Sequence, residues 1–160
     1  KGRHAITLHQ KGFHVEGIDL SQNSIDFANQ NSNSRLHFKV HDMRNVYKEN
    51  HFDYVLNLFT SFGYFDSYSE HETAISAMAK NLKKGGKLII DFMNSEKIIA
   101  ELVTEEIKRV DSIQFHIKRT LKEQAIIKEI SFQHHGQQHH FTEKVHAFTS
   151  HDFIRFFQNN

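Results

Sequence analysis

Two acidic residues, Asp19 and Asp42, each follow a short apolar segment and are the strongest candidates for ligand chemistry. A carboxylate suits a ribose, because its two oxygens can accept hydrogen bonds from two vicinal hydroxyls. Asp19 follows Gly2 by 17 residues, close to the spacing at which an acid reaches a ribose in dinucleotide-binding folds. We therefore expect Asp19 to hold a ribose and Asp42 to accept a hydrogen bond from an adenine amino group.

Other candidates adjoin these acids, precede the first expected helix or end a third apolar segment. Leu20 and Met43 are apolar side chains that could cover the faces of an adenine ring. Gly2 would let the backbone approach a ligand at a helix N-terminus. Asn57 and Phe59 close the third segment, and ligands of parallel sheets bind at the carboxyl ends of the strands.

Each acid also has a plainer interpretation. Asp19 could cap the helix that Ser21 begins, and Asp42 could be an ordinary turn residue. We favour the ligand roles because polar residues that could bind a ligand stand at the ends of successive apolar segments. Asp53 is interpreted as the start of a strand and not as a catalytic acid.

The spacing of apolar residues predicts an α/β fold. Helices are expected to begin near Ala5, after Ser21 and at Ser69, where Glu72 completes a capping box and Gly85-Gly86 ends the helix. Strands are expected over residues 14–20, 36–40, 52–59 and 87–92. Strands that alternate with helices predict a Rossmann-like, doubly wound, mostly parallel sheet.

The pattern changes after residue 94. A helix is expected over 95–107, and alternating strands over 113–121, 125–134 and 141–148, with a turn at Gly136. Alternation of apolar and polar residues is typical of half-solvated antiparallel strands. A last helix is expected to be capped by Ser150.

These patterns predict three parts. Residues 1–94 would form a partial Rossmann-like core, and residues 95–149 a helix with an antiparallel β insertion that acts as a lid. Residues 150–160 would begin a helix that returns to the core.

The order of the motifs resembles the class I S-adenosylmethionine-dependent methyltransferases, in particular small bacterial members with an antiparallel lid. Residues 1–5 (KGRHA) resemble the end of their glycine-rich first motif, and residues 14–21 (HVEGIDLS) their second strand with its ribose-binding acid. Residues 41–44 (HDMR) resemble the adenine-binding segment. Residues 52–55 (FDYV) resemble the fourth strand, and residues 82–90 (LKKGGKLII) the turn into the fifth.

The resemblance implies an S-adenosylmethionine site and a methyl transfer by in-line displacement onto a small molecule. In such a reaction the protein mainly positions the reactants and excludes water. We expect the chain to be truncated at both ends relative to the family, without its first strand and its last two. The cofactor-binding residues would be Gly2, Arg3, Asp19, Leu20, Asp42, Met43, Asn57 and Phe59.

The acceptor side is less defined. The loop after the strand over 52–59 offers Phe59, Thr60, Phe62, Tyr64 and Phe65, and Asn94 follows the strand over 87–92. We also expect the three phenylalanines to belong in part to the core. Phe62, Tyr64 and Asn94 are the main candidates, and no residue has the spacing of a general base.

Composition narrows the partners. The 160 residues include 20 Lys and Arg against 19 Asp and Glu, a formal charge of +1. This balance argues against nucleic acid and membrane surfaces, which attract a basic excess. Cysteine is absent from the sequence, which excludes disulfides and thiolate catalysis. The sequence has no apolar run of about 20 residues and no signal-peptide pattern, so we expect a cytoplasmic domain.

The 14 histidines raise the question of a metal. His134, His135, His139 and His140 flank Gly136, but no carboxylate or cysteine lies among them. A metal site needs several ligands with supporting partners, so we expect a solvated turn and no metal. We expect His71 to lie on the surface. A substrate contact by His116 or His146 on the inner face of the lid stays open.

Two other functions stay open. A nicotinamide-dependent Rossmann oxidoreductase would also bind adenine and ribose, but the sequence has no Tyr-x-x-x-Lys pattern. A non-catalytic methyltransferase-like module would bind a partner through its aromatic surface. Exposed strand edges would also allow a homodimer.

Overall fold

The structure, a computed structural model, describes residues 1–159. The chain divides into two compact units, and each is described by itself. Unit 1 comprises residues 1–55 and 73–87, and unit 2 comprises residues 56–72 and residue 88 onward. No helix within residues 1–159 is long and apolar enough to cross a membrane.

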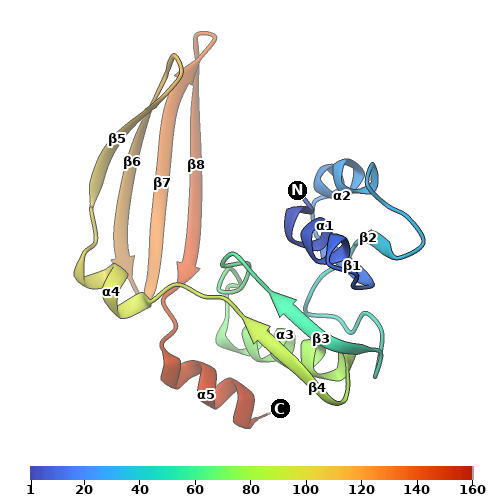
Figure 1. The fold of residues 1–160 in the computed structure, drawn as a ribbon. Coiled ribbons are helices and arrows are strands. Elements are labelled where there is room, and N and C mark those ends of the chain that lie inside the picture. Colours follow the sequence, from blue (N-terminus) through green and yellow to red (C-terminus); the bar gives the residue numbers. More distant parts are fainter. Residues whose placement is uncertain (160) are drawn as a thin grey trace. The chain divides into compact units, whose positions relative to one another are not determined.

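Unit 1 begins with two helix–strand pairs (Figure 1). Strands β1 and β2 are parallel, with Val15 opposite Leu36 and Asp19 opposite Val40. Gly17 in β1 leaves room for the ring of Phe38, because a Cβ at position 17 would lie only 2.6 Å from that ring. The elements are α1 (Arg3–Gln10), β1 (Val15–Asp19), α2 (Gln22–Asn29) and β2 (Leu36–Val40).

The loop after β2 is held by partly buried polar contacts. The Asn81 side-chain oxygen accepts hydrogen bonds from the backbone N–H of Tyr47 and of Lys48, both at 2.8 Å. The Tyr47 hydroxyl donates to Glu16 at 2.8 Å. Burial, together with this bond to Glu16, raises the pKa of Tyr47 to about 12. These contacts restrain the loop that carries Asp42.

Strand β3 (Phe52–Asn57) is followed by α3 (Tyr68–Asn81) and β4 (Leu82–Ile90). β3 and β4 form a two-stranded sheet, and their arrows point the same way in Figure 1. The predicted stop of this helix at Gly85-Gly86 is wrong, because β4 already begins at Leu82 and pairs with β3.

The predicted capping box at Ser69 and Glu72 is also wrong. Ser67 and Glu70 form the capping box instead, two residues earlier in the chain. Glu70 N–H donates to Ser67 Oγ at 3.3 Å, and Ser67 N–H donates to Glu70 Oε2 at 3.1 Å. Both pairs have the same spacing of three, so the sequence pattern alone does not separate them.

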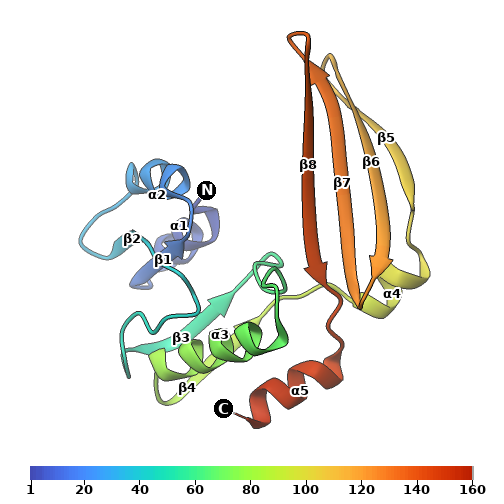
Figure 2. The same cartoon turned by 180° about the vertical axis from the view of Figure 1, so that it is seen from behind.

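Unit 2 contains a four-stranded antiparallel sheet in the order β5-β6-β7-β8, which Figure 2 shows from behind. The prediction of antiparallel strands is confirmed, and β7 has the predicted bounds. The elements of this region are α4 (Ser95–Ala100), β5 (Glu105–Val110), β6 (Ile113–Lys122), β7 (Ala125–His134), β8 (Gln137–His146) and α5 (Ser150–Gln158).

The predicted helix over residues 95–107 is wrong in its second half. α4 ends at Ala100, and β5 pairs with β6 along its whole length, from Glu105 opposite Lys118 to Val110 opposite Ile113. The spacing of Ile98 and Leu102 suits a helix locally. The β-branched residues that follow pair instead with the edge of β6, whose backbone groups would otherwise lack partners.

An aromatic cluster forms the core of unit 2. Phe62 and Phe156 are both 0 % exposed, and the centre of the Phe62 ring lies 5.9 Å from that of Phe148. α5 begins at Ser150, so the predicted cap at Ser150 is wrong by one residue. Thr149 caps it, in a reciprocal capping box with Asp152.

His71 belongs to this cluster, so its predicted place on the surface is wrong. Its side chain is 0 % exposed, and its ring centre lies 4.7 Å from that of Phe148 and 5.0 Å from that of His146. The first turn of α3 is covered by aromatic rings that are distant in the sequence, which a capping pattern does not reveal.

Candidate functional site

Asp19 stands at the carboxyl end of β1, exposed to solvent. Its Oδ1 accepts a hydrogen bond from Ser21 N–H at 2.8 Å, while Ser21 Oγ caps α2 by accepting from Ser24 N–H at 3.2 Å. Ser21, and not Asp19, is therefore the N-cap. A carboxylate has about four acceptor positions, so this bond leaves Asp19 able to accept hydrogen bonds from two hydroxyls.

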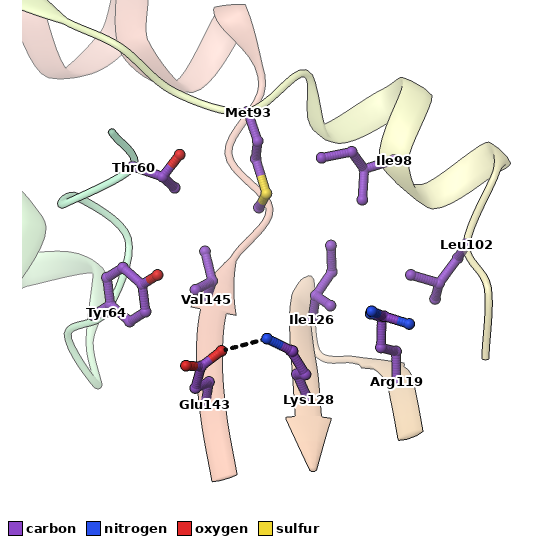
Figure 3. A pocket seen from close by; sticks show the side chains of 10 residues that line it. All are labelled: Thr60, Tyr64, Met93, Ile98, Leu102, Arg119, Ile126, Lys128, Glu143 and Val145. Carbon is purple, nitrogen blue, oxygen red and sulfur yellow. Dashed lines mark hydrogen bonds and ion pairs between the residues drawn. The ribbon is translucent and has the colours of Figure 1, made fainter. Parts of the chain in front are cut away.

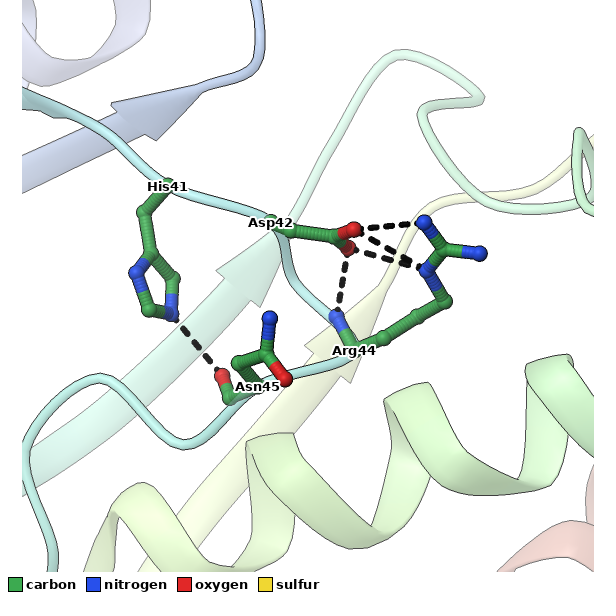
Figure 4. Close-up of polar contacts among 4 residues, drawn as sticks. All are labelled: His41, Asp42, Arg44 and Asn45. Carbon is green, nitrogen blue, oxygen red and sulfur yellow. Dashed lines mark hydrogen bonds and ion pairs between the residues drawn. The ribbon is translucent and has the colours of Figure 1, made fainter.

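Asp42 follows β2 by two residues, so the register of β1 and β2 places both acids at the same edge of this parallel pair. Figure 4 shows that both oxygens of Asp42 accept hydrogen bonds from Arg44, including a 2.6 Å ion pair with Nη2. These hydrogen bonds lower the pKa of Asp42. The turn interpretation thus describes the geometry, and an adenine amino group would share this carboxylate with Arg44.

Gly2 is the N-cap of α1 and has a left-handed backbone, φ +74°. A Cβ there would lie 3.1 Å from the Cβ of Ala28 and 3.2 Å from the ring of Phe38. Only glycine fits without strain, which keeps the start of α1 free of a side chain at this position. Arg3, the first residue of α1, is exposed.

These residues of unit 1 fit the chemistry of a nucleoside. Leu20, which adjoins the exposed carboxylate of Asp19, is 64 % exposed although it is a large apolar residue. Met43 is half-buried next to Asp42. Hydroxyl acceptors beside apolar side chains match a ribose that carries a flat ring.

In unit 2, Asn57 and Phe59 lie on the last residues of β3 and just after them. Asn57 is buried, whereas Phe59 is 70 % exposed. Phe59 and Thr60 have positive φ values, +61° and +51°. Such strain in a bulky residue costs about 1–3 kcal/mol and is concentrated at functional sites.

Asp91 holds this strained loop and was not among the predicted site residues. Its Oδ2 accepts from Phe59 N–H at 3.0 Å, and its own N–H donates to the carbonyl oxygen of Asn57 at 2.8 Å. The signal was present in the sequence, since Asp91 follows the last apolar residue of β4.

The structure separates the three main acceptor-side candidates. Phe62 lies in the aromatic core and not at a surface, because the rings around it exclude solvent. The Asn94 side chain caps α4 by accepting from Lys97 N–H at 3.1 Å. Tyr64 lines a pocket within unit 2, together with Thr60.

This pocket has a volume of about 180 Å³ and lies between α4, the loop after β3 and one face of the antiparallel sheet (Figure 3). Burial and the nearby carboxylate of Glu143 raise the pKa of Tyr64. The lining residues are Thr60, Tyr64, Met93, Ile98, Leu102, Arg119, Ile126, Lys128, Glu143 and Val145.

Most of these lining residues were missed from the sequence. One signal was available: Arg119 and Lys128 occupy alternating positions of β6 and β7 that are otherwise apolar, between Ile117 and Leu121 and between Ile126 and Ile130. A charged residue that interrupts an apolar face marks either a solvated edge or a binding site.

Two histidines lie close together at a turn of the antiparallel sheet. The rings of His134 and His135 have centres 3.9 Å apart at the β7–β8 turn. Within residues 1–159 there is no group of three or more histidine, cysteine, aspartate or glutamate side chains that could hold a metal ion.

The family of the chain follows from its first half. The model of the family described as "Methyltransferase domain" matches residues 1–86, which include α1, β1, β2 and the acids at their ends. The chain belongs to this methyltransferase domain family.

Known proteins agree with this assignment. YqeM of Bacillus subtilis (strain 168), a protein whose name describes a methyltransferase, is 33 % identical over 100 residues, 61 % of this chain. An S-adenosylmethionine-dependent methyltransferase from Clostridium acetobutylicum superposes on 89 % of the chain with a TM-score of 0.75 at 18 % identity. CalS10 of Micromonospora, an amino pentose methyltransferase with S-adenosylmethionine bound, covers 91 % with a TM-score of 0.68 at 20 % identity.

The fold is therefore the Rossmann-like fold of class I methyltransferases, with an antiparallel sheet in addition. The chain spans 40 % of the length of YqeM, and 61 % and 64 % of the two solved structures.

Proposed function

We propose that the protein containing this chain transfers the methyl group of S-adenosylmethionine to a small-molecule acceptor. The observation that carries the proposal is the exposed carboxylate of Asp19 at the end of β1, inside the segment that matches the methyltransferase family. S-adenosylmethionine supplies a methyl group bonded to a positively charged sulfur. When the acceptor takes the methyl group, the sulfur leaves as part of a neutral thioether.

The residues of unit 1 would hold the nucleoside. Asp19 would accept hydrogen bonds from the two ribose hydroxyls, and Asp42 from the adenine amino group. Leu20 and Met43 would cover the ring. Gly2 and Arg3 would contribute the start of α1, where backbone N–H groups favour polar and anionic ligand atoms.

The residues of unit 2 would serve the reaction by placing groups rather than by donating or taking protons. Asn57 and Phe59 belong to the loop that Asp91 holds in its strained shape. The pocket lined by Thr60 and Tyr64 would receive the acceptor. A nucleophile positioned in line with the leaving sulfur needs orientation and a water-poor setting above all.

A small molecule is the acceptor class that the chain favours. The formal charge of +1 offers no basic excess for nucleic acid, and the pocket volume of about 180 Å³ suits a compact group. CalS10, which shares the fold, is described as acting on an amino pentose. A homodimer stays a prediction.

Calorimetric titration of S-adenosylhomocysteine into the protein at its full natural length tests the proposal. We expect binding in the micromolar range that weakens at least about tenfold in Asp19→Ala, because hydrogen bonds to a charged group contribute about 1.5–3 kcal/mol. The matched control is Asp26→Ala, which removes an exposed acid on α2 whose carboxylate accepts a hydrogen bond from Gln22 of the same helix; this variant should bind normally.

The alternatives give different results. A non-catalytic module would show no heat and no thermal shift with S-adenosylhomocysteine. A nicotinamide-dependent oxidoreductase would bind NADH in preference to S-adenosylhomocysteine. Either result would overturn the proposed methyl transfer.

A further inference from the structure

A row of charged side chains crosses the pocket face of the antiparallel sheet. The register places Arg119 of β6 opposite Lys128 of β7, and Lys128 opposite Glu143 of β8. The neighbouring rows on the same face are apolar. They are Ile117–Ile130–Phe141 on one side and Leu121–Ile126–Val145 on the other.

Two cations directly opposite each other are an unfavourable pair on a sheet, since like charges at such positions repel. Each cation has a carboxylate partner on a neighbouring strand. Arg119 bonds Glu106 of β5 at 2.7 Å, and Lys128 bonds Glu143 at 3.2 Å. Within the row, Arg119 and Lys128 are direct neighbours, with no carboxylate between them.

Both cations keep donors beyond these ion pairs. Arg119 has five N–H donors and Lys128 has three, whereas the bonds to Glu106, to the carbonyl oxygen of Val103 and to Glu143 engage three in all. A planar guanidinium beside an ammonium is a suitable pair for a carboxylate or a phosphate.

The remaining walls of the pocket are apolar. Figure 3 shows Met93, Ile98 and Leu102 across from the sheet, with Lys128 and Arg119 pointing into the space between. A volume of about 180 Å³ accommodates a ring-sized group, because a cavity of about 150 Å³ holds benzene.

We propose that this pocket binds an amphipathic small molecule whose anionic group, a carboxylate or a phosphate, lies between Arg119 and Lys128 and whose ring-sized apolar part packs against Met93, Ile98 and Leu102. The assignment of this molecule as the methyl acceptor rests on the proposed function. The binding itself does not, because every residue involved belongs to unit 2.

The fluorescent anion 8-anilinonaphthalene-1-sulfonate is a suitable probe, since it joins an aromatic body to a sulfonate. We expect Lys128→Gln to weaken its affinity for the full-length protein at least tenfold. Lys118→Gln is the matched control: Lys118 lies on β6, on the opposite face, and also has one carboxylate partner, Glu105, at 3.3 Å. This control should leave the affinity unchanged.

Two further arms identify the chemistry. Glu143→Gln should tighten binding of the probe severalfold, because it removes the competing carboxylate while Lys128 remains. Phenylacetate and phenyl phosphate should displace the probe better than benzyl alcohol does, and the better of the two distinguishes a carboxylate site from a phosphate site.

Equal affinity of the probe for Lys128→Gln and Lys118→Gln would overturn the proposal, as would displacement by benzyl alcohol as effective as by the anions. Neither result depends on cofactor. If the protein binds the anionic probe but not S-adenosylhomocysteine, the proposed methyl transfer is rejected and the anion site stands. If it binds S-adenosylhomocysteine but Lys128→Gln does not weaken the probe, the anion site is rejected and the proposed methyl transfer stands.

Discussion

The two units build their candidate sites in different ways. In unit 1, Asp19 and Asp42 are oriented by residues two positions away, Ser21 and Arg44. In unit 2, the pocket joins Thr60 to Val145, across most of the unit's sequence. Local bonding makes the first site readable from motifs, whereas the second exists only once the sheet has formed.

The cores differ as well. Unit 1 buries aliphatic residues such as Ile25, Ala28 and Leu36, while unit 2 buries Phe62, Phe156 and other rings around His71. Large rings that contact many neighbours make a core sensitive to truncation. We therefore expect unit 2 to respond more strongly than unit 1 to the loss of one side chain.

The largest effect is expected for Phe62→Ala. Removal of this fully buried ring should lower the free energy of unfolding by about 3–5 kcal/mol, measured by urea denaturation. Phe59→Ala, three residues earlier but 70 % exposed, should stay within about 0.5 kcal/mol. Equal losses for the two variants would show that unit 2 does not depend on its aromatic core.

Asn81→Ala probes unit 1 and should cost about 2–3 kcal/mol. The buried Asn81 side chain accepts from two backbone N–H groups, those of Tyr47 and Lys48, and its removal leaves both without this acceptor. The same denaturation curves measure the loss, with the exposed Asn31→Ala as the control. A loss above that of Phe62→Ala would reverse the expected order of the two units.

The His71–His146 contact predicts a pH dependence that belongs to unit 2. Burial lowers the pKa of both histidines, so the unfolded chain binds protons more readily. This contribution is complete above about pH 6.5, the usual histidine value, and is lost as the pH falls from there toward the folded-state pKa. The slope is at most about 1.4 kcal/mol per pH unit for each proton.

Charged groups near this pair act in both directions. Lys144 lowers the pKa of His146 and Asp66 raises it, while Glu70 raises that of His71. Thermal melts between pH 5 and pH 8 should show the loss, and His146→Phe should reduce it. An unchanged pH profile in this variant would assign the acid sensitivity to other groups.

The smallest effect is expected at an exposed ion pair of unit 1. Asp53 bonds Lys83 at 2.9 Å, and both side chains are largely solvated. Asp53→Asn should change stability by less than about 1 kcal/mol and should leave S-adenosylhomocysteine binding unaltered. A loss of binding would instead place Asp53 in the site.

Much of the fold was predictable because its signals are local. Alternation predicted β7 with its observed bounds, and Ser21 was correctly interpreted as a helix cap. β5 was not predictable, because Ile98 to Val103 have spacings that suit a helix and only pairing with β6 decides the strand that follows. The site shows the same division. The sequence shows Asp91 at the end of an apolar segment and Tyr64 in the loop after β3, but it does not predict the contacts that these two residues make.

By itself, the sequence determined the family motifs, the order of helices and strands as far as α4, and the carboxylates at the ends of β1 and β2, because these depend on residues a few positions apart. Only the tertiary structure decided that His71 and Phe62 are buried together, and that Arg119, Lys128 and Glu143 form one row beside an apolar pocket. Burial and strand register arise from contacts between distant segments, and no local pattern specifies them.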